Sequence, residues 1–196
     1  MARGKVTKAE TKPIVDVGYS ERIDTFLKEK LEDRYYYFWQ QFTSQFPLPF
    51  HRPSSSSGKY HQSTAGTVDN LEEHTMDLIQ FVDKLARTFG DSREEQFYDI
   101  VLLAAALHDV QKYGDRNSLK HTTKEHGAIT AKTIMAKGEE FGLTADEAKM
   151  LSDLVLYHDG RWNSTNPGFK PIAFTQLQLF LHLADMASSR RILKFD

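Results

Sequence analysis

The feature that most constrains the fold is a series of apolar stripes at helical spacing that runs through the chain after residue 70. Apolar side chains recur three or four positions apart over residues 71–89, 97–113, 122–137, 144–158 and 174–188. Glycines and prolines separate these segments, as is typical of the connections between helices. No convincing strand or hairpin pattern occurs. The sequence therefore predicts an all-α fold.

The chain before residue 70 divides into three parts. Residues 1–18 are polar and basic, which predicts a flexible tail. Residues 20–46 have helical spacing and predict one aromatic-rich helix, whose aromatic side chains we expect to cover the core, although they could also form a dimer surface. Residues 47–68 are rich in proline, glycine and serine and predict a linker. Residues 19–196 would then form a single domain with its core over residues 69–190.

The composition disfavours several classes of protein. Lysine and arginine number 25 against 27 aspartates and glutamates, and this net charge of −2 disfavours a dedicated duplex-DNA-binding protein. The absence of cysteine excludes disulfides, zinc-thiolate sites, iron-sulfur clusters and cysteine nucleophiles. Neither an apolar run long enough to span a membrane nor a secretory signal occurs. These features predict a soluble, cytoplasmic protein without a membrane partner.

Ionisable residues lie on or beside the apolar stripe of each of these predicted helices. They are His74, His108, Asp109, His126, His158 and Asp185. One buried imidazole is satisfied by a hydrogen bond to a carbonyl group, but a buried carboxylate is strongly destabilising unless it is paired or binds a metal. Because one cation would compensate the whole set, the pattern predicts a metal site where the helices meet.

The order of these residues resembles that of a known family. His74, the doublet His108-Asp109 and Asp185, each on its own predicted helix, match the H…HD…D pattern of the HD-domain superfamily of metal-dependent phosphohydrolases. The resemblance covers about residues 59–190 and includes the segments LEEHTMDL, LAAALHDVQK and FLHLADMASS. Other segments, such as KYHQSTAG and HDGRWN, are similar to HD proteins often encoded by phages.

This resemblance implies an HD-domain helical bundle and a set of site residues. The primary metal ligands would be His74, His108, Asp109 and Asp185. In binuclear HD families two further histidines bind a second ion that the aspartate of the doublet bridges, and His126 and His158 match them in order. Lys112 lies at the lysine of the family's HDxGK pattern, which implies a phosphate-binding role, although Gln111 replaces the glycine.

The ligand types indicate a transition metal and hydrolytic chemistry. Imidazoles mixed with carboxylates suit Mn, Fe, Co, Ni or Zn, with one or two ions per chain. Such ions activate water and polarise phosphoryl oxygens, so we expect hydrolysis of a phosphate ester or anhydride of a nucleotide. Asp109 and Lys112 are the predicted catalytic residues. The candidate substrate-binding residues are Lys112, Lys120, Lys124, Arg161, Arg190 and His61.

Three alternatives stay open at this point. One is a 3′-to-5′ exonuclease on single-stranded nucleic acid, because residues 60–75 also resemble the start of the HD module in a bacterial exoribonuclease. The second is a di-iron oxygenase, since some binuclear HD proteins use the same six ligands for oxygen chemistry. The third is a non-catalytic binding module that retains the fold.

Overall fold

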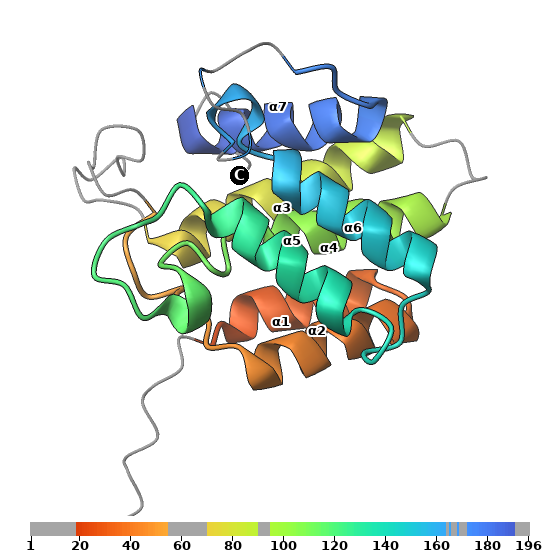
Figure 1. The fold of residues 1–196 in the computed structure, drawn as a ribbon. Helices are drawn as coiled ribbons and strands as arrows, with labels where there is room; N and C mark the ends of the chain where they lie inside the picture. The colour runs from red at the N-terminus through yellow and green to blue at the C-terminus, as the bar shows by residue number, and fades with distance from the viewer. Residues whose placement is uncertain are drawn as a thin grey trace, which may run out of the picture.

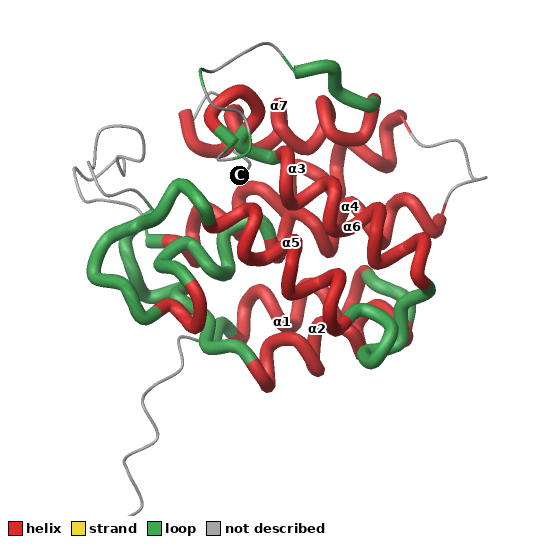
Figure 2. The backbone as a smooth tube through the Cα atoms, in the orientation of Figure 1, coloured by secondary structure: helices red, strands yellow, loops and turns green. Residues whose placement is uncertain are grey.

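The computed structural model describes residues 19–54, 70–89, 95–163, 165, 168 and 172–190. Over these residues the all-α prediction is confirmed, since they contain no strand beyond one isolated bridge between Pro53 and Asn70 (Figure 2). The elements are α1 (Glu21–Lys30), α2 (Asp33–Gln45), α3 (Leu71–Phe89), α4 (Glu95–Leu107), α5 (His126–Lys137), α6 (Ala145–Tyr157) and α7 (Gln176–Arg190), with 3-10 helices η1 (Asp115–Asn117) and η2 (Gly160–Trp162).

Helix α4 is the centre of the bundle. Every residue from Ile100 to Leu107 is buried, as expected of a helix that is surrounded by protein on all sides. Helices α3, α6 and α7 pack on α4, while α5 packs on α6. Figure 1 shows α7 across one end of the bundle and α1 and α2 across the other. The residues that follow Leu107 therefore leave α4 inside the molecule.

The predicted helix over residues 20–46 is two helices, which corrects that prediction. Ser20 caps α1, but α1 ends at Lys30 and the chain is extended at Leu31 before α2 begins. Asp24 on α1 accepts hydrogen bonds from the Tyr36 hydroxyl (2.9 Å) and the Trp39 indole (3.0 Å) on α2. A single helix of this length would extend about 40 Å, whereas the turn lets both apolar faces reach one core.

The aromatic run of α2 covers the core, as predicted. Tyr35, Phe38 and Trp39 are buried in the same apolar cluster as the residues of α4. The beginning of the predicted linker is also packed, since Leu48 and Phe50 are buried and the Tyr113 hydroxyl donates to the carbonyl of Pro53 (2.6 Å). Burial of these apolar side chains removes them from water and stabilises the fold.

Parts of the predicted N-terminal organisation lie outside the described residues. These are the tail over residues 1–18 and the linker beyond residue 54. In the part of the chain that is described, no helix is both long and apolar enough to cross a bilayer.

Candidate metal centre

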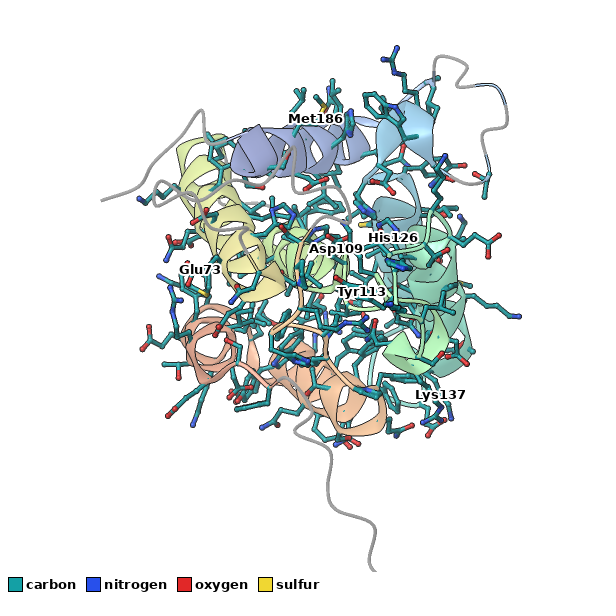
Figure 3. All side chains as sticks on the ribbon, turned by 90° about the vertical axis from the view of Figure 1, so that its left-hand side faces the viewer. Glu73, Asp109, Tyr113, His126, Lys137 and Met186 are labelled. Atoms are coloured by element: carbon teal, nitrogen blue, oxygen red, sulfur yellow. The ribbon has the colours of Figure 1, made fainter. Side chains whose placement is uncertain are left out.

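The six predicted ligands come together in the interior from five helices. His74 lies in the first turn of α3, His108 and Asp109 directly follow α4, and His126 begins α5. His158 directly follows α6, and Asp185 lies on α7. Asp109 and the four histidines are buried. Figure 3 shows Asp109 and His126 inside the molecule, whereas Glu73 and Lys137 lie at its edge.

The ligand atoms form two adjacent groups. Those of His74, His108 and Asp185 lie within 4.8 Å of one another, as do those of Asp109, His126 and His158. The Asp109 carboxylate joins the groups, because its Oδ2 is 3.3 Å from His108 Nε2 and its Oδ1 is 3.0 Å from His126 Nε2. One carboxylate thus faces both groups, as a bridging ligand must.

Backbone contacts determine which imidazole nitrogen faces the site. Nδ1 of His108, His126 and His158 lies 2.7, 2.7 and 2.6 Å from a carbonyl oxygen three residues earlier in the chain. A carbonyl oxygen only accepts hydrogen bonds, so Nδ1 carries the proton of the neutral ring. Each Nε2 therefore presents a lone pair to the interior, and this orientation is typical of metal-binding histidines.

The Nε2 atoms of the four histidines face one another and an unpaired carboxylate oxygen. His74 Nε2 is 3.0 Å from His108 Nε2, and His126 Nε2 is 3.1 Å from His158 Nε2. Asp109 Oδ1 is buried and receives no hydrogen bond from the described residues. Acceptors in such contact repel each other unless a cation lies between them. The mixed imidazole and carboxylate donors fit a divalent transition metal.

The charges of the cluster show what replaces a metal when none is bound. Burial lowers the pKa of His158, but Asp159 and Asp109 outweigh it and raise this pKa to about 9. For Asp109 the directions are reversed. Burial raises the pKa of this carboxyl group, but the charges of Lys112 and His108 outweigh burial and hold the pKa well below its ordinary value. Without a metal, a proton on the His158 imidazole therefore supplies positive charge to the facing carboxylates.

The doublet reaches the site because α4 ends before it. The sequence predicted a helix that continues to about Tyr113, but α4 ends at Leu107 and turns follow. His108 Nδ1 bonds the Ala105 carbonyl, which the Asp109 N–H would have bound in a continuing helix. Similarly, α5 begins at His126 rather than at Thr122, and His126 Nδ1 bonds the Thr123 carbonyl.

The predicted substrate-binding residues are placed differently from one another. Lys112 reaches the centre, with Nζ 2.5 Å from Asp109 Oδ2. Lys120, Lys124 and Arg161 are exposed, and Arg161 stacks on the ring of Trp162 at 4.5 Å. His61 and the side chain of Arg190 lie outside the described residues.

One residue of the centre was missed by the analysis of the sequence. Asp159 Oδ2 is 3.3 Å from His126 Nε2, and its Oδ1 is 3.6 Å from His158 Nε2. The available signal was the second His-Asp doublet, at residues 158–159, which repeats the first at residues 108–109. His182 on α7 bonds the His158 carbonyl through Nδ1 (2.6 Å).

Comparison with known proteins agrees with this geometry. The family model of the HD domain matches residues 71–190, which include all six predicted ligands. A search of the curated proteins and a search of the solved structures each found no match. Since the matched segment is more than half of the chain, the protein belongs to the HD-domain family, whose members are typically metal-dependent hydrolases.

Proposed function

We propose that this protein is a metal-dependent phosphohydrolase that cleaves a phosphate ester or anhydride of a nucleotide. The observation that carries the proposal is the pair of imidazole contacts, Nε2 to Nε2 at 3.0 and 3.1 Å, on either side of the buried Asp109 carboxylate. Such an arrangement favours bound cations, and the two groups of donors offer places for two of them.

The ligands of the two ions follow from the two groups. The first ion would be held by His74, His108 and Asp185, and the second by His126 and His158, with Asp109 shared between them. When bound, a divalent ion at such a site supplies Lewis acidity and lowers the pKa of a coordinated water to near neutrality. Asp109, which faces both groups, orients the reacting water toward the phosphorus atom.

Lys112 supplies a positive charge beside the carboxylate. Its side chain is only 16% exposed and its Nζ lies 2.5 Å from Asp109 Oδ2. Burial lowers the pKa of Lys112, but the Asp109 and Asp159 charges outweigh burial and raise it, so the amine stays protonated. Lys112 therefore holds the carboxylate in place and offers N–H donors to an anionic phosphoryl oxygen. This pairing favours a phosphate substrate over a neutral one.

The exposed cations are proposed to bind the rest of the nucleotide. Arg161 follows the second doublet by two residues, and its guanidinium stacks on the 44% exposed ring of Trp162. A planar cation beside an exposed aromatic ring can hold a phosphate and a base together. We also propose phosphate contacts for two other exposed residues, Lys120 and Lys124. The remaining candidates, Arg190 and His61, stay predictions from the sequence.

The experiment is a metal-dependent hydrolysis assay. Protein freed of metal with a chelator and reloaded with Mn, Co or Zn is incubated with nucleoside mono-, di- and triphosphates and cyclic nucleotides. We expect phosphate, pyrophosphate or nucleoside to be released only after reloading, and not by the variant His108→Ala. Turnover of none of these substrates by protein with bound metal would contradict the proposal.

Two further assays on the same preparation separate the alternatives. A ladder of products from a labelled single-stranded oligonucleotide, without turnover of nucleotides, would instead indicate an exonuclease. Oxygen consumption that depends on iron would indicate an oxygenase. Bound metal without any of these activities would indicate a binding module.

A further inference from the structure

We propose that Asp159 is a ligand of the second ion, in addition to the six residues that the family pattern supplies. The inference deepens the proposed function and rests on its binuclear site. The second ion would then be held by His126, His158 and Asp159, together with the shared carboxylate of Asp109.

The distances around Asp159 are those of donors that share one ion. Ligand atoms about 2.1 Å from a common metal are about 3.0 Å apart at a right angle and about 3.4 Å apart at a tetrahedral angle. The Asp159 oxygens are 3.3 Å from His126 Nε2 and 3.6 Å from His158 Nε2. The Nε2 atoms of these two histidines are 3.1 Å apart. Both separations are close to those of donors in one coordination sphere, although each involves a different oxygen of Asp159. The ligand atom of Asp159 also lies within 4.8 Å of those of His158 and Asp185, so Asp159 lies beside the second group and near the carboxylate of the first.

A second observation is that this group contains a buried acceptor without a hydrogen bond. Asp109 Oδ1 points into it, lying 3.0 Å from His126 Nε2 and 3.6 Å from His158 Nε2. This oxygen is buried and is not hydrogen-bonded by any described residue. Two carboxylates thus face the Nε2 atoms of two imidazoles, and a bound divalent cation would be attracted by both carboxylates and by both neutral imidazoles.

The two ions would then have equivalent ligands. The first has two histidines, its own carboxylate from Asp185, and Asp109. Without Asp159 the second has two histidines and only the shared carboxylate, so it would be held by less negative charge. With Asp159 each ion has two imidazoles, one carboxylate of its own and one that is shared. The two sites then attract a divalent ion to a similar degree.

The local backbone holds Asp159 in this position. Asp109 and Asp159 are each the second residue after a helix, and each follows a histidine whose Nδ1 bonds the carbonyl three residues earlier. The chain then turns at Gly160, where φ is +58° and a Cβ atom would lie 2.6 Å from the His182 ring. Because only glycine fits this turn without strain, the turn constrains where the Asp159 carboxylate points.

The test counts the ions and measures their affinities. Metal-free wild-type protein, the variant Asp159→Asn and the control Asp153→Asn are titrated calorimetrically with Mn or Zn, and bound metal is measured by mass spectrometry. Asp153 is a matched control, because it is an aspartate on α6 whose side chain pairs with Lys149 at 2.6 Å and belongs to neither group of candidate ligands. We expect two ions on the wild type and on D153N. On D159N the affinity of one site should fall at least about 10-fold and that of the other should be unchanged.

The outcomes separate this inference from the proposed function. Equal affinities of D159N and wild type at two sites would overturn the role of Asp159 alone. A single ion on the wild type would overturn the binuclear site and this inference with it. Two ions on the wild type without hydrolysis of any nucleotide would overturn the proposed function, while the effect of D159N on metal binding would still support Asp159 as a ligand.

A measurement on the wild type covers the case in which D159N does not fold. Crystals of the metal-loaded protein give anomalous peaks that locate the ions. An Asp159 oxygen within about 2.3 Å of the second ion would support the proposal. A separation of about 4 Å or more would overturn it.

Discussion

Two buried carboxylates of this protein, Glu147 and Asp109, are satisfied in opposite ways. Glu147 is only 2% exposed, and the chain's own donors reach both of its oxygens. Oε1 accepts from Arg34 (2.6 Å) and the Tyr35 hydroxyl (2.8 Å), and Oε2 accepts from Arg34 (3.1 Å) and the Thr144 N–H (2.8 Å). Burial raises the pKa of Glu147, but these hydrogen bonds, that of Arg34 first, lower it to about 2.

Asp109 is as deeply buried, yet its neighbours do not complete its hydrogen bonding. Lys112 donates a hydrogen bond to Oδ2 of Asp109, whereas Oδ1 accepts none from the described residues and faces the Nε2 atoms of His126 and His158. The difference lies in the partners. Arginine, tyrosine and backbone N–H groups always carry a proton to donate, whereas the neutral rings of His108, His126 and His158 donate their one proton from Nδ1 to a backbone carbonyl. A buried acid surrounded by donors stabilises a fold, and a buried acid surrounded by acceptors requires a cation.

The largest expected effect comes from replacing the acid that lacks donors. Asp109→Asn should lower metal-dependent hydrolysis by about 10³-fold or more, since it removes the carboxylate shared by both ions. Glu147→Gln should keep hydrolysis near the wild-type rate, because Glu147 lies outside the centre. The measurement is initial phosphate release at saturating metal. Turnover by D109N at the wild-type rate would contradict the conclusion that Asp109, unlike Glu147, binds a metal needed for hydrolysis.

Metal removal should destabilise the protein strongly. A ligand present at about 1,000 times its Kd stabilises the folded state by about 4 kcal/mol, which corresponds to a Tm difference of about 10 °C for a chain of this size. We expect a chelator to lower the Tm by this amount, measured by differential scanning fluorimetry. E147Q should start from a lower Tm and show the same decrease. An unchanged wild-type Tm would indicate that no ion is bound.

The metal-free protein should lose stability as the pH rises from 7 to 9. Burial lowers the pKa of His158 and the facing carboxylates raise it, from 6.5 to about 9 in the folded state. A raised folded-state pKa stabilises the fold fully below 6.5, and this contribution is lost as the pH rises through about 9. The shift bounds the loss at about 3 kcal/mol, measurable by urea unfolding.

The same pH range provides a control for this prediction. Metal affinity should increase from pH 7 to 9, because ions and protons compete for the imidazoles. The difference in stability between wild type and E147Q should stay constant there, since the pKa of Glu147 is far below this range. A flat stability profile for the metal-free protein would contradict a protonated His158.

The smallest effect is expected at Glu147, whose two oxygens both accept hydrogen bonds from the chain. Arg34→Ala removes two hydrogen bonds to Glu147, but the Arg34 side chain is 44% exposed, so we expect a loss of only about 1–2 kcal/mol. This loss should shrink as the pH falls from 4.5 toward 2, because protonation of Glu147 removes its need for a cation. The number of bound ions should not change. A change in metal content would show that the two clusters are coupled.

Much of the fold could be predicted because helical periodicity is a local property. The helices α1 and α3 are capped by Ser20 and Asn70, whose side chains accept backbone N–H groups as these residue types typically do. The break at Leu31 could not be predicted from the sequence, because the residues on both sides of it have good helical spacing. It results from the contacts of Asp24 with Tyr36 and Trp39, which exist only once α1 and α2 pack together.

For the candidate site, the sequence by itself determined the residue types and their order. Buried ionisable groups are stable only when they are paired or bind a metal, so the six residues His74, His108, Asp109, His126, His158 and Asp185 already predicted a cation. Only the tertiary structure showed that the Asp109 carboxylate faces histidines of both groups and that Asp159 lies beside His126 and His158. The physical reason is that coordination depends on distances of a few ångströms between side chains of different helices, and these distances are determined by helix packing and by the turns where the helices end.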